Sequence, residues 1–168
     1  PREPTSGAAA DECGIVVAGV QNSGPVQDWR AVVLADCTVT GEGPSGWARA
    51  AIRAMERFGA DRLVAEVNQG GQMVQEVIRQ VDPLVPYKGV HASRGKVARA
   101  EPVAALYEQG RVKHLPDLDG LEDQMCRMTR RGYEGGGSPD RVDALVWALH
   151  ELMIEPAAKW RQPGVRTL

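Results

Sequence analysis

Short apolar runs alternate with amphipathic segments along most of this chain, and their order restricts the folds that it can adopt. The first two apolar runs, residues 13–20 and 29–40, flank a turn-like cluster at residues 21–25, which predicts an antiparallel hairpin. From residue 47 onward the pattern predicts helix, strand, helix, strand, helix, strand and then two helices. A hairpin followed by strand–helix alternation predicts an α/β fold, a mixed β-sheet with helices on both faces.

The spacing of apolar residues also gives expected bounds for each element. Helices are predicted over residues 47–58, 72–81, 101–109 and 118–128 and from 138 onward, and strands over 63–67, 84–90 and 111–115. Ser45 is expected to cap the first helix and Ser138 the last, with Pro139 in the first helical position. The expected organisation is one domain over residues 1–156 and a C-terminal tail over residues 157–168.

Composition limits the classes of protein to consider. With 168 residues, 43% of them hydrophobic and 25% charged, the chain is expected to form one globular domain. Its net charge of −2 provides no overall basic field for nucleic acid, although a local basic patch remains compatible with it. The cysteines, Cys13, Cys37 and Cys126, are odd in number and far apart, which argues against a disulfide framework and a cysteine zinc site. That usage is typical of a reducing cytosol.

The sequence contains no recognisable targeting signal. No apolar run approaches the roughly 18 residues of a membrane span. No charged start precedes an apolar region, so a signal peptide is not predicted either. The chain starts at Pro1, without Met, and continues into loop-like residues, which predicts that it is a piece of a longer protein.

Two glycine-rich segments resemble nucleotide-binding motifs but do not satisfy them. Residues 41–46 fit G-x-G-x-x-G, yet they follow the second strand of a hairpin, whereas the fingerprint belongs to the first turn of a parallel βαβ unit. Residues 89–96 fail the P-loop pattern because five residues separate the glycines and Val97 replaces the required Ser or Thr. Neither segment supports a nucleotide site.

Acidic residues occur at two transitions between elements. Glu66 lies inside the buried-type strand 63–67, and Asp140 and Asp143 lie three residues apart at the start of the last helix. A carboxylate at the end of a core strand is costly unless it is paired or bound to metal, and oxygen ligands suit Mg²⁺ or Mn²⁺. The structural alternatives are a hydrogen-bonded strand end and acids that complement the helix dipole. Local sequence leaves both interpretations open.

Basic residues concentrate in the segment before the third predicted helix. Lys88, Arg94, Lys96 and Arg99 fall within twelve residues, interleaved with small and polar side chains. Such a loop can bind phosphates through side chains and backbone N–H groups, and the alternative is a solvated loop that happens to be basic. Acids that hold two metal ions about 3.5–4 Å apart, beside a loop that binds a polyanion, would suit a metal-dependent nuclease.

Several segments together resemble one protein family. They are residues 63–71 (LVAEVNQGG), 95–103 (GKVARAEPV) and 138–149 (SPDRVDALVWAL), with 11–19 (DECGIVVAG) and 46–48 (GWA) in support. In this order they resemble the C-terminal nuclease domain of large terminase subunits, the DNA-packaging motors of tailed bacteriophages and of phage-like gene transfer agents. The resemblance covers nearly the whole chain.

The resemblance implies a fold, an activity and a set of partners. The implied fold is RNase H-like, as in retroviral integrases and Holliday-junction resolvases. The implied enzyme is an endonuclease that cuts concatemeric double-stranded DNA during packaging and uses two divalent ions, Mg²⁺ or Mn²⁺. Double-stranded DNA, the terminase ATPase domain, the small terminase subunit and the portal are the implied partners. The cytoplasm of a bacterial host is the implied location, with no secretion.

The resemblance also assigns roles to the acids. Glu66 matches the acid of the central strand, Asp143 the last acid on the C-terminal helix, and Asp140 its partner three residues earlier, all as catalytic metal ligands. Relatives place another essential Asp at the end of a first strand, just before a loop like residues 1–10. That strand is expected to be truncated here, which would leave the fragment inactive as it stands, and Asp11 is a candidate auxiliary ligand. The implied mechanism is attack of a metal-activated water on phosphorus while the second metal stabilises the departing 3′ oxygen.

Two other functions remain compatible with these residues. A Holliday-junction resolvase-like or repair nuclease would share the fold but prefer four-way junctions to linear duplex. A non-catalytic DNA-binding or docking module of the packaging motor would leave supercoiled plasmid intact in Mn²⁺.

Overall fold

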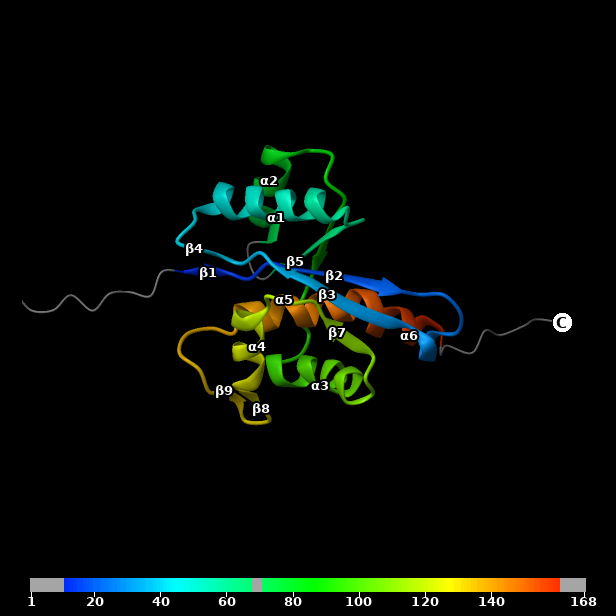
Figure 1. Cartoon of the computed structure of the whole chain (residues 1–168). Helices are drawn as coiled ribbons and strands as arrows, with labels where there is room; N and C mark the ends of the chain where they lie inside the picture. Colours follow the sequence, from blue (N-terminus) through cyan, green and yellow to red (C-terminus); the bar gives the residue numbers. More distant parts are fainter. Residues whose placement is uncertain (1–10, 68–70, 161–168) are drawn as a thin grey trace, which may run out of the picture.

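The elements of the computed structural model, which describes residues 11–67 and 71–160, follow the alternation expected from the sequence (Figure 1). The strands are β1 (Glu12–Cys13), β2 (Val16–Gln21), β3 (Arg30–Asp36), β4 (Val39–Thr40), β5 (Leu63–Glu66), β6 (Tyr87–Val90), β7 (Val112–His114), β8 (Met128–Thr129) and β9 (Gly132–Tyr133). The helices are α1 (Pro44–Phe58), α2 (Gly71–Val81), α3 (Lys96–Glu108), α4 (Asp119–Cys126), α5 (Asp140–Leu149) and α6 (Glu155–Trp160), with the 3₁₀ turn η1 (Val26–Asp28) and the π-helical segment η2 (His150–Ile154).

The predicted hairpin is confirmed, and the strands form a mixed arrangement. β2 pairs antiparallel with β3, from Val16 opposite Asp36 to Gln21 opposite Arg30, and β7 adds in parallel to the other side of β3. β5 and β6 form a separate parallel pair in which Glu66 lies opposite Val90. Within the described residues, β2 and β5 therefore each keep one edge that no strand covers.

Helices cover both faces of these strands, as the alternation predicted (Figure 1). On one face, α1 and α2 pack on each other and on β5 and β6 through Ala48, Ile52 and Ile78. On the opposite face, the larger core joins β3 and β7 to α3, α4 and α5. No helix of the described ranges is long and apolar enough to cross a membrane.

Helix α5 forms the centre of the larger core because its apolar residues recur at helical spacing. Val142, Leu145, Val146 and Leu149 are buried on one face. The helix axis continues through η2 and α6 to residue 160, so the boundary predicted at residue 156 falls inside α6. The predicted tail beyond residue 160 lies outside the described residues.

The two serine caps were predicted wrongly. α1 begins at Pro44 with Gly43 in the N-cap position, so Ser45 lies within the first turn, consistent with the fixed φ of proline suiting a helix start. At the start of α5, the Gln124 side chain from α4 accepts hydrogen bonds from the backbone N–H groups of Arg141 and Val142, at 3.0 and 3.3 Å. Gln124 thus satisfies two N–H groups in the first turn of α5, and one of them, that of Arg141, is a group that a Ser138 cap would have bonded.

Helix α3 starts five residues earlier than predicted. The Arg99 N–H already donates to the Gly95 carbonyl at 3.0 Å, so helical bonding begins ahead of Pro102, which had been placed at the helix start. Lys96 and Arg99 consequently lie one turn apart on a helix and not on the predicted basic loop. This shift directs both cations toward the acids of α5 and β5.

The connection between β1 and β2 packs directly against the start of α5. A Cβ atom added to Gly14 would overlap the backbone carbonyl of Asp140, so only glycine permits this approach. Arg141 anchors the same corner by ion pairs to Glu12 and Asp36, both near 2.7–2.8 Å. Contacts from β1, the β1–β2 connection and the end of β3 thus fix where α5 begins.

Candidate metal and nucleic-acid site

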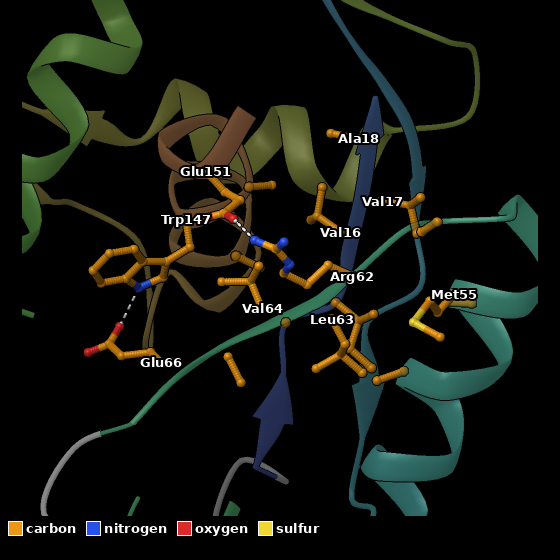
Figure 2. A pocket seen from close by; sticks show the side chains of 18 of the residues that line it. Val16, Val17, Ala18, Met55, Arg62, Leu63, Val64, Glu66, Trp147 and Glu151 are labelled. Carbon is orange, nitrogen blue, oxygen red and sulfur yellow. Dashed lines mark hydrogen bonds and ion pairs between the residues drawn. The ribbon is translucent and has the colours of Figure 1, made fainter. Parts of the chain in front are cut away.

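A cavity of about 1280 Å³ lies between the open edges of β2 and β5, with α1 and α5 contributing to its walls (Figure 2). We call it the central groove. Apolar side chains such as Val16, Val17 and Val64 line much of it. The four predicted acids also line it: Asp11, Glu66, Asp140 and Asp143. The candidate ligands predicted from the sequence therefore surround one cavity.

Glu66 is the last residue of β5 and is fixed by a residue of α5. Its Oε2 atom accepts a hydrogen bond from the indole Nε1 of Trp147 at 2.7 Å (Figure 2). The Glu66 side chain is 25% exposed. Because a carboxylate has two oxygens with several lone pairs, this bond leaves Glu66 able to bind another group.

Arg99 connects Glu66 to Asp143 electrostatically. Its Nη2 atom lies 3.6 Å from Glu66 Oε2 and 3.8 Å from Asp143 Oδ1, beyond hydrogen-bond distance. The guanidinium stacks over the Trp147 ring at 4.9 Å and donates through Nη1 to the Arg94 carbonyl at 2.7 Å. Arg99 is only 7% exposed, so its charge acts on the two acids with little screening by water.

Lys96 makes the shortest contact to the acids. Its Nζ atom lies 2.5 Å from Asp143 Oδ2 and donates to Ser138 Oγ at 3.2 Å. The Lys96 side chain is 46% exposed, whereas that of Asp143 is 17% exposed. Lys96 therefore approaches Asp143 from the solvent side, and Arg99 approaches from the protein interior.

Ionisation of Asp143 is held in balance by its surroundings. Burial raises the pKa of Asp143, and the negative charge of Glu66 adds to the rise. The hydrogen bond and charge of Lys96, together with the charge of Arg99, oppose it but leave the pKa raised. A further cation that enters the groove would therefore stabilise the ionised form of Asp143.

The raised pKa of Asp143 predicts that Asp143→Asn stabilises the metal-free fold at neutral pH. The folded state binds the proton of Asp143 more tightly than the unfolded state, so the free energy of unfolding falls as pH rises through the raised pKa. The uncharged amide of the variant would not carry this penalty. We expect D143N to unfold at higher urea than wild type at pH 7 in EDTA, and the difference to vanish as pH falls below the ordinary value of 3.8.

Asp123→Asn provides the control, because Asp123 is exposed on α4. Its difference from wild type should stay small across the same pH range. A D143N protein that is less stable than wild type at pH 7 would contradict the unfavourable ionisation inferred for Asp143.

Asp140 and Asp11 line the groove, but within the described ranges neither forms an ion pair with Lys96 or Arg99. Asp140 begins α5 beside β1, where its charge adds to the effect of burial in raising the pKa of Cys13. Asp11 is exposed, and its backbone carbonyl accepts a hydrogen bond from Gly41. In residues 11–67 and 71–160, no group of three or more His, Cys, Asp or Glu side chains is placed to hold a metal ion.

The donor set nevertheless has the chemistry of a hard-metal site. Glu66 and Asp143 supply only carboxylate oxygens, which suit Mg²⁺ or Mn²⁺. The two cations beside them offset part of the cost of burying this pair of acids, and the pKa of Asp143 remains raised in their presence. The residues present fit one part of a metal site, and Asp140 and Asp11 line the same groove.

The predicted basic group divides between two places. Lys96 and Arg99 face the acids, and Arg94 is exposed just before α3. Lys88 lies on β6, where its Nζ atom pairs with Glu151 at 2.5 Å and with Glu155 at 3.0 Å. The hydrogen bond to Glu151 is the main cause that raises the pKa of Lys88. Lys88 is thus engaged in tying β6 to η2 and α6.

Two residues of the site were missed in the sequence. Trp147 lies four residues after Asp143 on the same helix face, a spacing that could have connected them. The His150 ring, through Nε2, contacts the Arg99 carbonyl at 2.8 Å and so helps to hold α3 against η2. No sequence signal indicates that contact, because it joins residues 51 positions apart.

Comparison with known proteins gives consistent results. The family model described as the terminase RNaseH-like domain matches residues 4–152. The large terminase nuclease from thermophilic phage G20c with bound cobalt is similar in structure, with a TM-score of 0.60, 18% identity, and coverage of 84% of this chain and 82% of that chain. The same nuclease with bound magnesium gives a TM-score of 0.59 at 18% identity, with the same coverage. No curated protein matches the sequence.

Proposed function

The chain belongs to the terminase RNaseH-like domain family, and from that premise we propose that it is a metal-dependent endonuclease that cuts concatemeric double-stranded DNA during viral genome packaging. The observation that carries the proposal is the pair Glu66 and Asp143, which converge on Arg99 at the central groove from β5 and α5. Two half-buried acids held beside one buried cation form a place where a hard metal ion can be bound.

Mg²⁺ or Mn²⁺ is the proposed cofactor, with two ions in the working site. Glu66 and Asp143 would hold metal, and Asp140 and Asp11 are the remaining carboxylates of the groove that could join them. The similar phage G20c nuclease has been crystallised with cobalt and with magnesium, which supports a divalent ion. When bound, such ions would activate water and stabilise the departing oxygen of the phosphodiester.

The chain's own residues would orient the reacting groups. Trp147 fixes the Glu66 carboxylate through its indole N–H, which sets the direction of the remaining lone pairs. Arg99 keeps Glu66 and Asp143 on one side of the groove. Lys96 lines the groove, and Arg94, two residues earlier in the chain, is exposed. Both side chains are proposed to contact DNA phosphates.

The groove also supports the expectation of a further strand that carries another acid. It runs between the uncovered edges of β2 and β5, and both strands present apolar side chains to it. An extended segment here would pair with both edges, which exposed strand edges favour. An Asp at the end of such a strand would add a ligand to Glu66 and Asp143. The ATPase domain, small terminase subunit and portal are the partners that family membership suggests.

A plasmid-nicking assay tests the proposed activity. Supercoiled plasmid is incubated in Mn²⁺ with the protein joined to the acid-bearing first strand, and we expect conversion to nicked and linear DNA. Plasmid that stays supercoiled would overturn the nuclease proposal and favour a docking module. Cleavage of four-way junctions in preference to linear duplex would instead indicate a resolvase-like or repair nuclease.

DNA binding should distinguish Arg94 from Lys88, although both were predicted to contact DNA. Arg94→Gln is expected to weaken binding uniformly across sequences and to lower the salt slope by about one, because one phosphate contact is lost. Lys88→Gln should change binding little, since its ammonium is engaged by Glu151 and Glu155. Fluorescence anisotropy with a duplex over a range of salt concentrations measures both.

These two variants remove the same charge from nearby positions of the chain, so each controls for the other. Equal losses in the two variants would contradict the assignment and indicate a general electrostatic effect. Unchanged binding in R94Q would mean that this exposed residue is merely solvated.

A further inference from the structure

We propose that Lys96 is a tethered competitor for the metal ion: its ammonium occupies Asp143 in the metal-free protein and must leave that carboxylate when a divalent ion binds. This inference rests on the proposed metal-dependent function and adds a control element to the same site. The contact that carries it is the 2.5 Å distance from Lys96 Nζ to Asp143 Oδ2.

The two cations of the site differ in what they occupy. Lys96 lies within hydrogen-bond distance of Asp143 and therefore takes up lone pairs that a metal would need. Arg99 lies 3.6 and 3.8 Å from its two acids and supplies charge without occupying their oxygens. An incoming ion can therefore coexist with Arg99, whereas it must displace Lys96 from the Asp143 carboxylate that would bind it.

The two cations also differ in their freedom to move. Arg99 is buried, stacked on Trp147 and bonded to the Arg94 carbonyl, so its position is fixed by the core. Lys96 is 46% exposed on a flexible stem, and its second contact is the exposed hydroxyl of Ser138. Moving Lys96 toward solvent disrupts no core packing.

Displacement would make Lys96 available to DNA. Lys96 is the first residue of α3 and lines the central groove. Once its ammonium leaves Asp143, the nearest polyanion in the groove would be the DNA backbone. Metal binding and phosphate binding are thereby coupled through one side chain, and each should strengthen the other.

Metal affinity in the absence of DNA tests the inference. Titration calorimetry with Mn²⁺ alone compares wild type with Lys96→Gln, Lys96→Arg and Lys113→Gln. Lys113 is exposed on β7 and controls for the loss of one positive charge. We expect K96Q to bind Mn²⁺ roughly threefold to tenfold more tightly than wild type, because a direct competitor is removed, and K96R and K113Q to remain within about twofold of wild type.

The outcomes separate this inference from the function on which it rests. Asp143→Asn should weaken Mn²⁺ binding strongly, and if it binds like wild type, both the proposed site and the role of Lys96 are overturned. If D143N weakens binding but K96Q binds no more tightly than wild type, the competitor role alone fails. K113Q binding as tightly as K96Q would also overturn it, because net charge would then explain the effect.

A second readout follows Lys96 itself. In nitrogen-15 NMR of lysine ammonium groups, the resonance missing from K96R identifies Lys96. Addition of Mg²⁺ should shift that resonance toward the position of a solvated lysine, while the Lys113 signal stays in place. A Lys96 resonance that does not respond at saturating Mg²⁺ would contradict displacement.

Discussion

Replacing Glu66 with Gln, or Asp143 with Asn, is expected to abolish DNA cleavage while the protein stays folded. Each substitution removes one of the two carboxylates that converge on Arg99. Loss of a metal ligand that contributes about 4 kcal/mol to the transition state lowers the rate about a thousandfold. Plasmid nicking in Mn²⁺ measures the rate, and each variant is made in the protein joined to the acid-bearing first strand. Thermal melting checks the fold.

Matched variants on the surface separate this effect from a general loss of negative charge. Glu76→Gln on α2 and Asp123→Asn on α4 alter exposed acids that lie outside the groove lining. Both should cut at the wild-type rate. Wild-type rates in E66Q or D143N would show that other acids carry the chemistry.

Replacing Arg99 with Leu is expected to be the most destabilising change in the site. The substitution leaves two half-buried carboxylates without their shared cation and removes the donor to the Arg94 carbonyl. Breaking a buried pair typically costs about 3–5 kcal/mol, and the partial exposure of both acids reduces our expectation to about 2–3 kcal/mol. Urea unfolding at pH 7 in EDTA measures the loss.

Companion variants make the cause of that loss testable. Arg99→Lys should lose less, because it keeps the charge but not the planar stack on Trp147. Arg53→Leu, at an exposed position of α1, should change stability little. Adding D143N to R99L should recover part of the loss by removing one uncompensated charge. A single R99L protein as stable as wild type would refute the role assigned to this guanidinium.

The acids could be predicted from sequence because each lies at a position with a local signal. Glu66 interrupts the end of an apolar strand, and Asp143 lies one turn into an amphipathic helix beside its buried face. Hairpin pairing and the two helical layers followed from the same periodicity. The sequence could therefore predict both the layer architecture and which acids are candidate metal ligands.

The partners of those acids could not be predicted in the same way, because they depend on contacts between distant segments. Arg99 was assigned to a DNA-binding loop, yet the early start of α3 turns it inward against Trp147. Gln124 caps α5 from another helix, and no local pattern around Ser138 indicates that a distant side chain takes the capping role. The hairpin of β8 and β9 was not predicted, because each strand has only two residues and Met128 had been placed at the end of the helix 118–128.

Stability and function are opposed at this site. The carboxylates of Glu66 and Asp143 repel each other, and burial raises the pKa of Asp143. Two cations compensate part of this charge in the metal-free fold: Arg99, which is fixed by the core, and Lys96, which metal is proposed to displace. Residues that bind a cofactor commonly carry such a cost in its absence.

A crystal structure of the protein soaked in Mn²⁺, with the ions located by their anomalous scattering, tests whether Glu66 and Asp143 bind metal. We predict Mn²⁺ bound to both Glu66 and Asp143, with Arg99 still stacked on Trp147 and Lys96 moved away from Asp143. The same map would show whether Asp140 or Asp11 joins the metal. Saturating Mn²⁺ that leaves Glu66 and Asp143 without metal would contradict the proposed nuclease site.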